Sequence, residues 1–267
     1  MAVEEKNMYT NRKPGVEIIS GKLLDIIADN HIVKLEYEQY KSSGKGNGSI
    51  ETKSALMEVP DVDLSQFQVG DNVTLVKVSN ANKSYMLKDG QSLSLKTGSY
   101  VSKKDGETKD TGITVIRGRL VFAGYKDEKG NMSKAGTPKK EHYDLLINTP
   151  GQTHIINIYN GTTSYNSNAI QNAQNKYDNI DFKDNFVTGT FITGLANGEY
   201  TKQDDKGNDV LYTKYFGITN PKTDDLTITP KVKQQSKDTP TQESTKSEDG
   251  FTNIPDDLDA ELDDIFQ

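Results

Sequence analysis

Apolar and polar residues alternate over much of the chain, which is the period of half-buried β-strands. The alternating runs are rich in Val, Ile, Leu and Tyr, and short turns rich in Asn, Asp, Gly and Ser separate them. The expected strands lie at 16–28, 31–40, 50–59, 72–79, 84–95, 113–126, 140–148, 153–160, 186–195 and 210–219. An Asn- and Gln-rich stretch at 166–177 is the one helix that we expect. The pattern therefore predicts a mainly β protein.

These strands form two groups of five that resemble each other weakly. Residues 18–23 (IISGKL) are similar to residues 115–120 (VIRGRL), and residues 67–73 are similar to residues 180–186. In each half the first motif begins a long strand, and the second follows a candidate short helix and begins the fourth strand. Three strands, a helical connection and two further strands is the order of the OB-fold barrel. We therefore expect two tandem OB-fold-like five-stranded barrels, with a divergent β-sandwich as the alternative.

The composition of the segments between and after these strands predicts the domain boundaries. The expected division is a first barrel at 1–96, a linker at 97–112, a second barrel at 113–230, a disordered linker at 231–250 and an acidic–hydrophobic tail at 251–267. Within the two barrels, Gly21 and Gly118 stand where a long first strand has to bend, and glycine permits that bend.

Charge is segregated along the chain. The whole sequence carries a net charge of −7, but residues 243–267 hold nine acidic residues and only one basic residue. Residues 1–242 keep 30 acidic and 31 basic residues, so the body is neutral to slightly basic. The chain has no cysteine, which excludes disulfides and thiolate sites. It has no apolar run long enough to span a membrane, and we expect a cytoplasmic protein.

No catalytic constellation is visible in the sequence. There is no G-x-S-x-G or H-E-x-x-H motif, and the Gly- and Lys-rich run at 43–49 lacks P-loop spacing. The three histidines, His31, His142 and His154, are widely separated. We therefore expect a protein that is not an enzyme and that has no cofactor and no metal.

Alternation along residues 113–126 separates a cationic and aromatic strand face from an apolar one. The residues of the first face are Arg117, Arg119 and Tyr125, and those of the second are Ile116, Leu120 and Phe122. Lysine and arginine beside exposed aromatic rings are what single-stranded nucleic acid requires, because bases stack on rings and cations contact phosphates. The wider candidates include Tyr40, Tyr212 and Phe216. The expected DNA contacts are Lys22, Lys34, Tyr37, Tyr85, Lys88, Arg117, Arg119, Tyr125, Tyr143, Tyr159, Lys214 and Tyr215. The competing interpretation is that strand tyrosines of this kind are core or rim packing.

The last residues carry a resemblance to a known family. Asp263, Asp264, Ile265 and Phe266 resemble the acidic–hydrophobic tip of bacterial and phage single-stranded-DNA-binding proteins, usually Asp-Asp-Asp-Ile-Pro-Phe. This chain lacks the proline and continues to Gln267. The resemblance implies an OB-fold core and a tail that recruits replication or recombination proteins through these four residues.

The leading hypothesis is non-enzymatic, largely sequence-independent binding of single-stranded DNA in replication or recombination. In this hypothesis the acidic tail recruits partner proteins and competes with DNA for the cationic face. One alternative is a phage or mobile-element structural or assembly protein built on β-sandwiches, without nucleic-acid binding. Another is an RNA or oligosaccharide binder on the same barrels. We expect no membrane partner, and self-association is left open.

Overall fold

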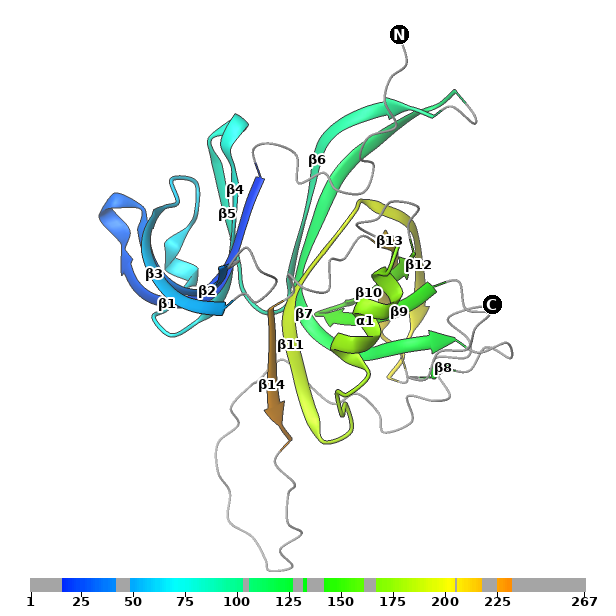
Figure 1. The fold of residues 1–267 in the computed structure, drawn as a ribbon. Coiled ribbons are helices and arrows are strands. Elements are labelled where there is room, and N and C mark those ends of the chain that lie inside the picture. Colours follow the sequence, from blue (N-terminus) through cyan, green and yellow to red (C-terminus); the bar gives the residue numbers. More distant parts are fainter. Residues whose placement is uncertain are drawn as a thin grey trace, which may run out of the picture. The chain divides into compact units, whose positions relative to one another are not determined.

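The computed structural model describes most of the body of the chain (Figure 1). The described residues are 16–41, 49–102, 106–126, 132–133, 142–160, 167–204, 206–217 and 225–231. The expected tail, with Asp263, Asp264, Ile265 and Phe266, lies outside them. Within the described part the protein is mainly β, with one α-helix and two sheets, and these strands form no closed barrel. None of the described helices is long and apolar enough to cross a bilayer.

Two compact units divide the chain. One consists of residues 1–118 with 189–195, and the other of residues 119–188 with 196–267. The boundary falls inside two strands, β7 (Thr108–Lys126) and β11 (Asn185–Thr193), so each of these strands contributes residues to both units.

The first unit contains a five-stranded sheet in the order β3-β2-β1-β4-β5. Its strands are β1 (Val16–Ile27), β2 (Ile32–Lys41), β3 (Ser49–Glu58), β4 (Asn72–Val78) and β5 (Lys83–Leu87). Short 3-10 turns follow three of them: η1 (Ala28–Asn30), η2 (Leu64–Gln66) and η3 (Ser79–Ala81). The alternation along β1 to β4 buries one face, on which Leu23, Leu35 and Leu75 have no exposed surface.

Gly21 lies where the backbones of β1 and β2 come close together. A Cβ atom added there would lie 2.2 Å from the backbone oxygen of Glu36, which is too close for any side chain. The register of β1 against β2 shifts between Leu23 and Asp25, two residues farther along. Glycine is therefore required by the close approach of two backbones at a bend of the first strand.

One expected strand and one expected linker differ from the structure. The run at 84–95 is divided between β5 and β6 (Gln91–Val101), with a turn at Gly90, whose φ is +85°. Most of residues 97–112, expected as a linker, lie in the ends of β6 and β7, which pair with each other in a long curved hairpin (Figure 1). Polar residues dominate this hairpin end, and backbone pairing holds it in strand form without the apolar pattern that predicts a strand.

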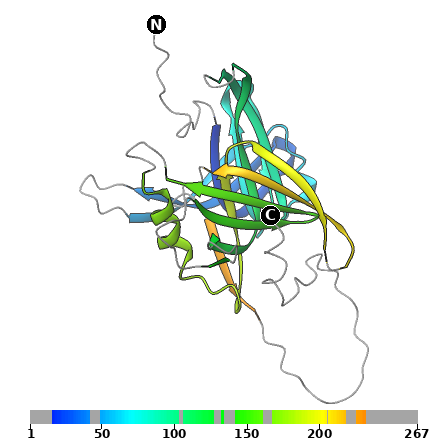
Figure 2. The same ribbon diagram turned by 90° about the vertical axis from the view of Figure 1, so that its right-hand side faces the viewer.

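The second sheet has nine strands. Its order is β12-β13-β10-β9-β7-β11-β14, with β6 and β8 paired to β7 outside this path. The strands not yet introduced are β8 (Met132–Ser133), β9 (His142–Thr149), β10 (Gln152–Tyr159), β12 (Ala196–Gln203), β13 (Asp209–Gly217) and β14 (Asp225–Pro230). The pairing of β10 with β13 is parallel, whereas β9 and β12 pair antiparallel with their neighbours (Figure 2). The sequence pattern did not predict β8, β12 or β14.

One face of the second unit's strands forms its core with the helix α1 (Ala169–Tyr177). Ile170, Ala173 and Tyr177 lie on one side of the helix and are buried. The helix packs against β9 and β10, whose Leu145 and Ile156 have no exposed surface. The opposite face of the same strands is the one on which the candidate site lies.

A bulge in β7 changes which of its side chains reach that opposite face. The register of β7 against β9 shifts between Leu120 and Phe122, so Val121 is the extra residue. One extra residue reverses the alternation from there on. Phe122 therefore shares a face with Arg119, whereas Tyr125 points into the core and is only 4% exposed. The sequence prediction had these two aromatic residues the other way round.

Candidate nucleic-acid interface

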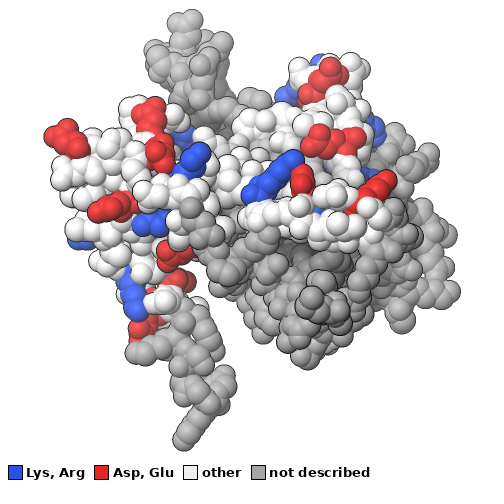
Figure 3. Space-filling view, turned by 90° about the horizontal axis from the view of Figure 1, so that it is seen from above, with Lys and Arg blue, Asp and Glu red and all other residues white. Residues whose placement is uncertain are grey.

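Charge density does not by itself single out a binding surface on the face drawn in Figure 3. There, Lys and Arg residues alternate with Asp and Glu residues, and among the described residues no large area carries one sign. The candidate site is therefore identified from local contacts between cations and aromatic rings.

A row of cross-strand neighbours runs over one face of the second unit. Arg119 on β7 is opposite Asn148 on β9, and Asn148 is opposite Thr153 on β10. Thr153 is opposite Tyr212 on β13, and Tyr212 is opposite Tyr200 on β12. Directly opposite residues point to the same side of a sheet, so these five side chains share a face. We call them the cross-strand row; at roughly 4.8 Å per strand it is about 19 Å long.

One end of the row is a cluster of two cations on a phenylalanine ring. Phe186 on β11 is 40% exposed. The guanidinium carbon of Arg119 lies 4.3 Å from the centre of the Phe186 ring, and Lys231 Nζ lies 5.4 Å from it. Burial lowers the pKa of Arg119 from its ordinary value near 12.5, but the group stays a cation at neutral pH. This end therefore offers an exposed ring beside two positive charges.

The other end of the row is a pair of stacked tyrosines. The rings of Tyr200 and Tyr212 are 5.1 Å apart and nearly parallel, and Lys214 Nζ lies 5.3 Å from the Tyr200 ring centre. Both tyrosines pack against the buried Leu146 and Ile155, which fixes them on the sheet. Burial, and then the charge of Tyr212, raise the pKa of Tyr200 to about 12, so its ring is neutral at physiological pH.

The middle of the row is polar. The Thr153 hydroxyl donates a hydrogen bond of 3.0 Å to the Asn148 side-chain oxygen. Thr153 is only 7% exposed, whereas Asn148 is half-buried. The row therefore has an aromatic group with a neighbouring cation at each end and a short polar stretch between them. This arrangement suits stacked bases and the phosphates that join them.

Three of the predicted contacts in the second half lie on this face of the sheet. Arg119 belongs to the row, and Lys214 lies beside it on β13. Tyr159 is half-buried on β10, six residues after Thr153 and therefore on the same face of the strand. Its ring centre lies 5.2 Å from the ring centre of His142. These positions came from strand alternation, and the structure brings them to one face.

Three other predicted contacts in the second half are buried. Tyr143 has no exposed surface and donates a 2.7 Å hydrogen bond to Asp178, and its ring meets the edge of Tyr125 at 5.1 Å. Tyr215 is 3% exposed, and its hydroxyl oxygen lies 3.0 Å from His154 Nδ1. Tyr125, Tyr143 and Tyr215 expose no ring face to a base and are left out of the candidate interface.

Arg117 is buried too, in the first unit. It is 1% exposed, its Nε lies 2.8 Å from an Asp89 oxygen, and its NH1 group donates to the hydroxyls of Thr74 and Thr190. Arg117, expected on the cationic face as a DNA contact, is instead the centre of a polar network inside the sheet.

The remaining predicted contacts of the first unit do not gather into a cationic face. Lys22 is exposed but is opposite Glu36, and Lys34 lies two residues from Glu36 on the same face of β2. Tyr37 and Tyr85 pack against apolar clusters of the first unit.

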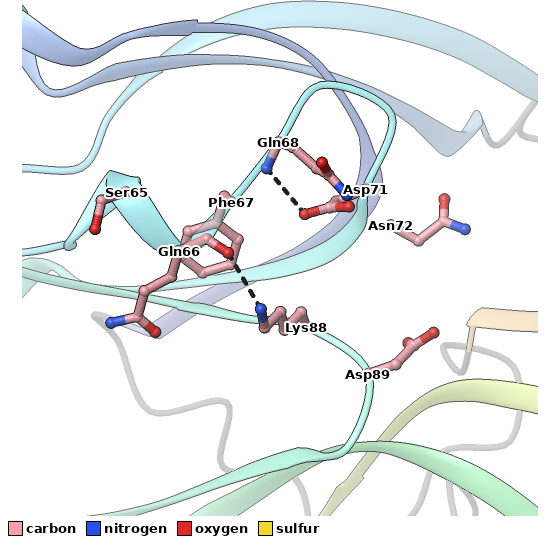
Figure 4. A pocket seen from close by; sticks show the side chains of 8 residues that line it. All are labelled: Ser65, Gln66, Phe67, Gln68, Asp71, Asn72, Lys88 and Asp89. Carbon is pink, nitrogen blue, oxygen red and sulfur yellow. Dashed lines mark hydrogen bonds between the residues drawn. The ribbon is translucent and has the colours of Figure 1, made fainter. Parts of the chain in front are cut away.

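Lys88, the last of the predicted set, borders a pocket of about 420 Å³ in the first unit (Figure 4). Its Nζ donates a 3.1 Å hydrogen bond to the Gln66 carbonyl oxygen and lies 6.0 Å from the Phe67 ring centre. Two carboxylates, Asp71 and Asp89, line the same pocket. Two acids beside one lysine disfavour a phosphate, so this pocket is not part of the candidate interface.

Sequence reasoning missed Phe186, Tyr200 and Lys231. Residues 196–203 (ANGEYTKQ) have no apolar alternation, so no strand was expected there. The signal that could have found this strand is the spacing of Gly198, Tyr200 and Lys202. These residues are two positions apart, so a strand here would carry one ring and one cation on the same face. Comparison of the chain with models of known protein families, with curated proteins and with solved structures found no match.

Proposed function

We propose that this protein is a non-enzymatic binder of single-stranded DNA and that the cross-strand row, with Phe186, Lys214 and Lys231, is its binding surface. The observation that carries the proposal is the exposed Phe186 ring with Arg119 and Lys231 beside it, together with the stacked Tyr200 and Tyr212 at the other end of the cross-strand row. Stacking on such rings needs no particular base, so binding would be largely independent of sequence.

The strand order of each unit supports an OB-like arrangement, the finer part of the proposal. In the first unit β1 is the central strand, between β2 and β4, and the short turn η2 precedes β4. In the second unit the helix α1 connects the third strand of the meander, β10, to β11, and β7 is flanked by β9 and β11. OB-folds bind oligonucleotides over the face of their second and third strands, which correspond to β9 and β10 here.

The resemblance of the acidic tip to single-stranded-DNA-binding proteins extends the proposal to the tail. Lys231, which touches the Phe186 ring, is the point from which the chain continues towards the tail. Residues 231–250 have the composition of a linker between the body and the acidic tail. The tail would therefore compete with DNA for the row and, once displaced, recruit replication or recombination proteins.

The test is a titration of the full chain with a fluorescent oligothymidine, followed by anisotropy. We expect salt-sensitive binding and much weaker binding to a duplex of the same length. Phe186→Ala and Tyr200→Ala should each weaken binding by about 1–3 kcal/mol, the range for one stacked base. Arg119→Ala should also reduce the slope of log K against log salt by about 0.7, as expected for one lost phosphate contact.

The control is Lys96→Ala, which removes a lysine of the first unit that is paired with Asp110. It should leave the affinity unchanged. If oligothymidine does not bind at low salt, the DNA proposal is wrong and a structural or assembly role becomes the better account. Equal or tighter binding of oligouridine would redirect the proposal to RNA.

A further inference from the structure

The β3 strand has an open edge. It is the last strand of the five-stranded sheet, and no described strand pairs with its second edge. Ten consecutive residue pairs join it to β2 without a register shift, and it contains neither proline nor glycine. Natural edge strands are usually blunted by a bulge, a proline, a short length or charged side chains, because a regular edge pairs with other strands. Of these devices β3 has only charged side chains, Glu51, Lys53 and Glu58.

The outer face of β3 carries two large exposed apolar side chains. Ile50 is 66% exposed and Leu56 is 63% exposed. They are six residues apart and therefore on the same face, with the exposed Thr52 and Ser54 between them. Apolar side chains on a long, regular and exposed edge strand favour pairing of that edge with another strand.

The pattern along β3 is complementary to itself. If two β3 strands pair antiparallel about a two-fold axis at Lys53, Ile50 of each copy is opposite Leu56 of the other. Thr52 is then opposite Ser54. Aliphatic pairs and hydroxyl pairs of this kind stabilise a sheet, and the two-fold axis forms each of them twice.

Charges on the other face of β3 fit the same register. Lys53 lies on the axis opposite its own copy, but Glu51 of each copy is its diagonal neighbour across the new interface, within reach of long side chains. Lys53 Nζ also donates a 2.6 Å hydrogen bond to Gln39 on β2, which directs it away from the axis. Direct repulsion between the two lysines is thereby reduced.

We propose that the protein forms a homodimer in which β3 pairs antiparallel with β3 of a second copy, centred on Lys53. The pairing joins two five-stranded sheets into one continuous sheet. It requires no nucleic acid and involves none of the residues of the cross-strand row.

The first test measures the mass of the full chain, without DNA, by sedimentation over a range of concentrations. We expect a dimer for the natural chain, and Leu56→Lys and Ile50→Lys should each shift the mass to that of a monomer. Val69→Lys is the matched control, because Val69 is 61% exposed in the same unit but lies off β3. A natural chain that stays monomeric, or a dimer that survives Leu56→Lys, overturns the proposal.

The second test examines the register. The natural chain has no cysteine, so Lys53→Cys introduces a single thiol on the proposed axis. Directly opposite Cβ atoms in a sheet come within reach of a disulfide. We expect Lys53→Cys to form a covalent dimer under mild oxidation, and Lys83→Cys, on the opposite edge strand β5, to remain a monomer in a denaturing gel. Cross-linking of Lys83→Cys instead would assign the interface to β5 and refute this one.

Discussion

Arg117 and Arg119 are two residues apart on β7 and have opposite surroundings. Arg117 is enclosed by two threonine hydroxyls and Asp89, whereas Arg119 lies half-buried against the Phe186 ring. Local sequence does not distinguish them, because residues two positions apart on a strand point to the same face. The neighbours that make one structural and the other a candidate contact come from β4 and β11, which are distant in sequence.

The Arg117–Asp89 pair leads to an asymmetric prediction for stability. Asp89→Ala removes the carboxylate beside a buried guanidinium. Loss of one partner of a fully buried pair costs about 3–5 kcal/mol, and the 43% exposure of Asp89 places the expected loss below that range. Arg117→Met removes the buried charge, and the Asp89 carboxylate, which is 43% exposed, can then be hydrated. We expect urea unfolding to show the larger loss for Asp89→Ala. An equal loss in both variants would contradict this account of the network.

His154 makes the stability of the second unit depend on pH. It has no exposed surface, and burial lowers its pKa from 6.5 to about 4. As the pH falls, His154 is therefore protonated near pH 6.5 in the unfolded chain but only near pH 4 in the folded protein. The stability from neutral His154 is complete above pH 6.5 and falls by about 3 kcal/mol as the pH drops to 4.

The measurement is urea unfolding at a series of pH values in that window, for the natural chain and for His154→Gln. Glutamine keeps hydrogen-bonding groups near Thr149 and Tyr215 but does not titrate. We expect a smaller decline for His154→Gln between pH 6.5 and 4. Identical declines would mean that other groups cause the acid sensitivity.

At the scale of the element, β7 shows how a single bulge redistributes side chains. Strict alternation predicts Phe122 in the core and Tyr125 outside, and the extra residue at Val121 exchanges them. Alternation was nevertheless a sound guide to the position of Arg119, which precedes the bulge. Bulges have no reliable sequence signal here, because the shift is decided by pairing with β9.

The bend of β1 predicts the effect of two glycine substitutions. Gly21→Ala places a methyl group 2.2 Å from a backbone oxygen and should cost about 1–3 kcal/mol, the usual range for overpacking. Gly198→Ala is the control, since nothing lies within 4 Å of its added Cβ. It should be neutral or slightly stabilising. Thermal unfolding of the two variants compares them, and a neutral Gly21→Ala would mean that β1 and β2 separate easily.

At the scale of the whole molecule, the acidic tail predicts a gain of function on truncation. Removing residues 243–267 changes the net charge of the chain from −7 to +1. If the tail occupies the cross-strand row, the truncated chain should bind oligothymidine more tightly at low salt, with a difference that shrinks as salt rises. A synthetic peptide of residues 243–267 should compete with DNA in the same anisotropy assay. Weaker binding after truncation would rule out competition by the tail.

Several features of this protein follow from the sequence alone. Alternating apolar residues predicted the β content and eight of the strands to within two residues at each end, because burying one face of a strand leaves a period of two. The helix was found within three residues of its start, since Ile170, Ala173 and Tyr177 share one side. The segregation of charge between body and tail likewise needs no coordinates.

Tertiary structure alone decided which candidate residues share a surface. Sequence predicted Arg119, Tyr159 and Lys214, but Phe186 and Tyr200 joined them only through the pairing of β7, β11, β12 and β13. It also removed Arg117, Tyr143 and Tyr215 by burying them. The physical reason is that the period of a strand identifies its two faces, whereas pairing and packing with distant strands decide which face is covered.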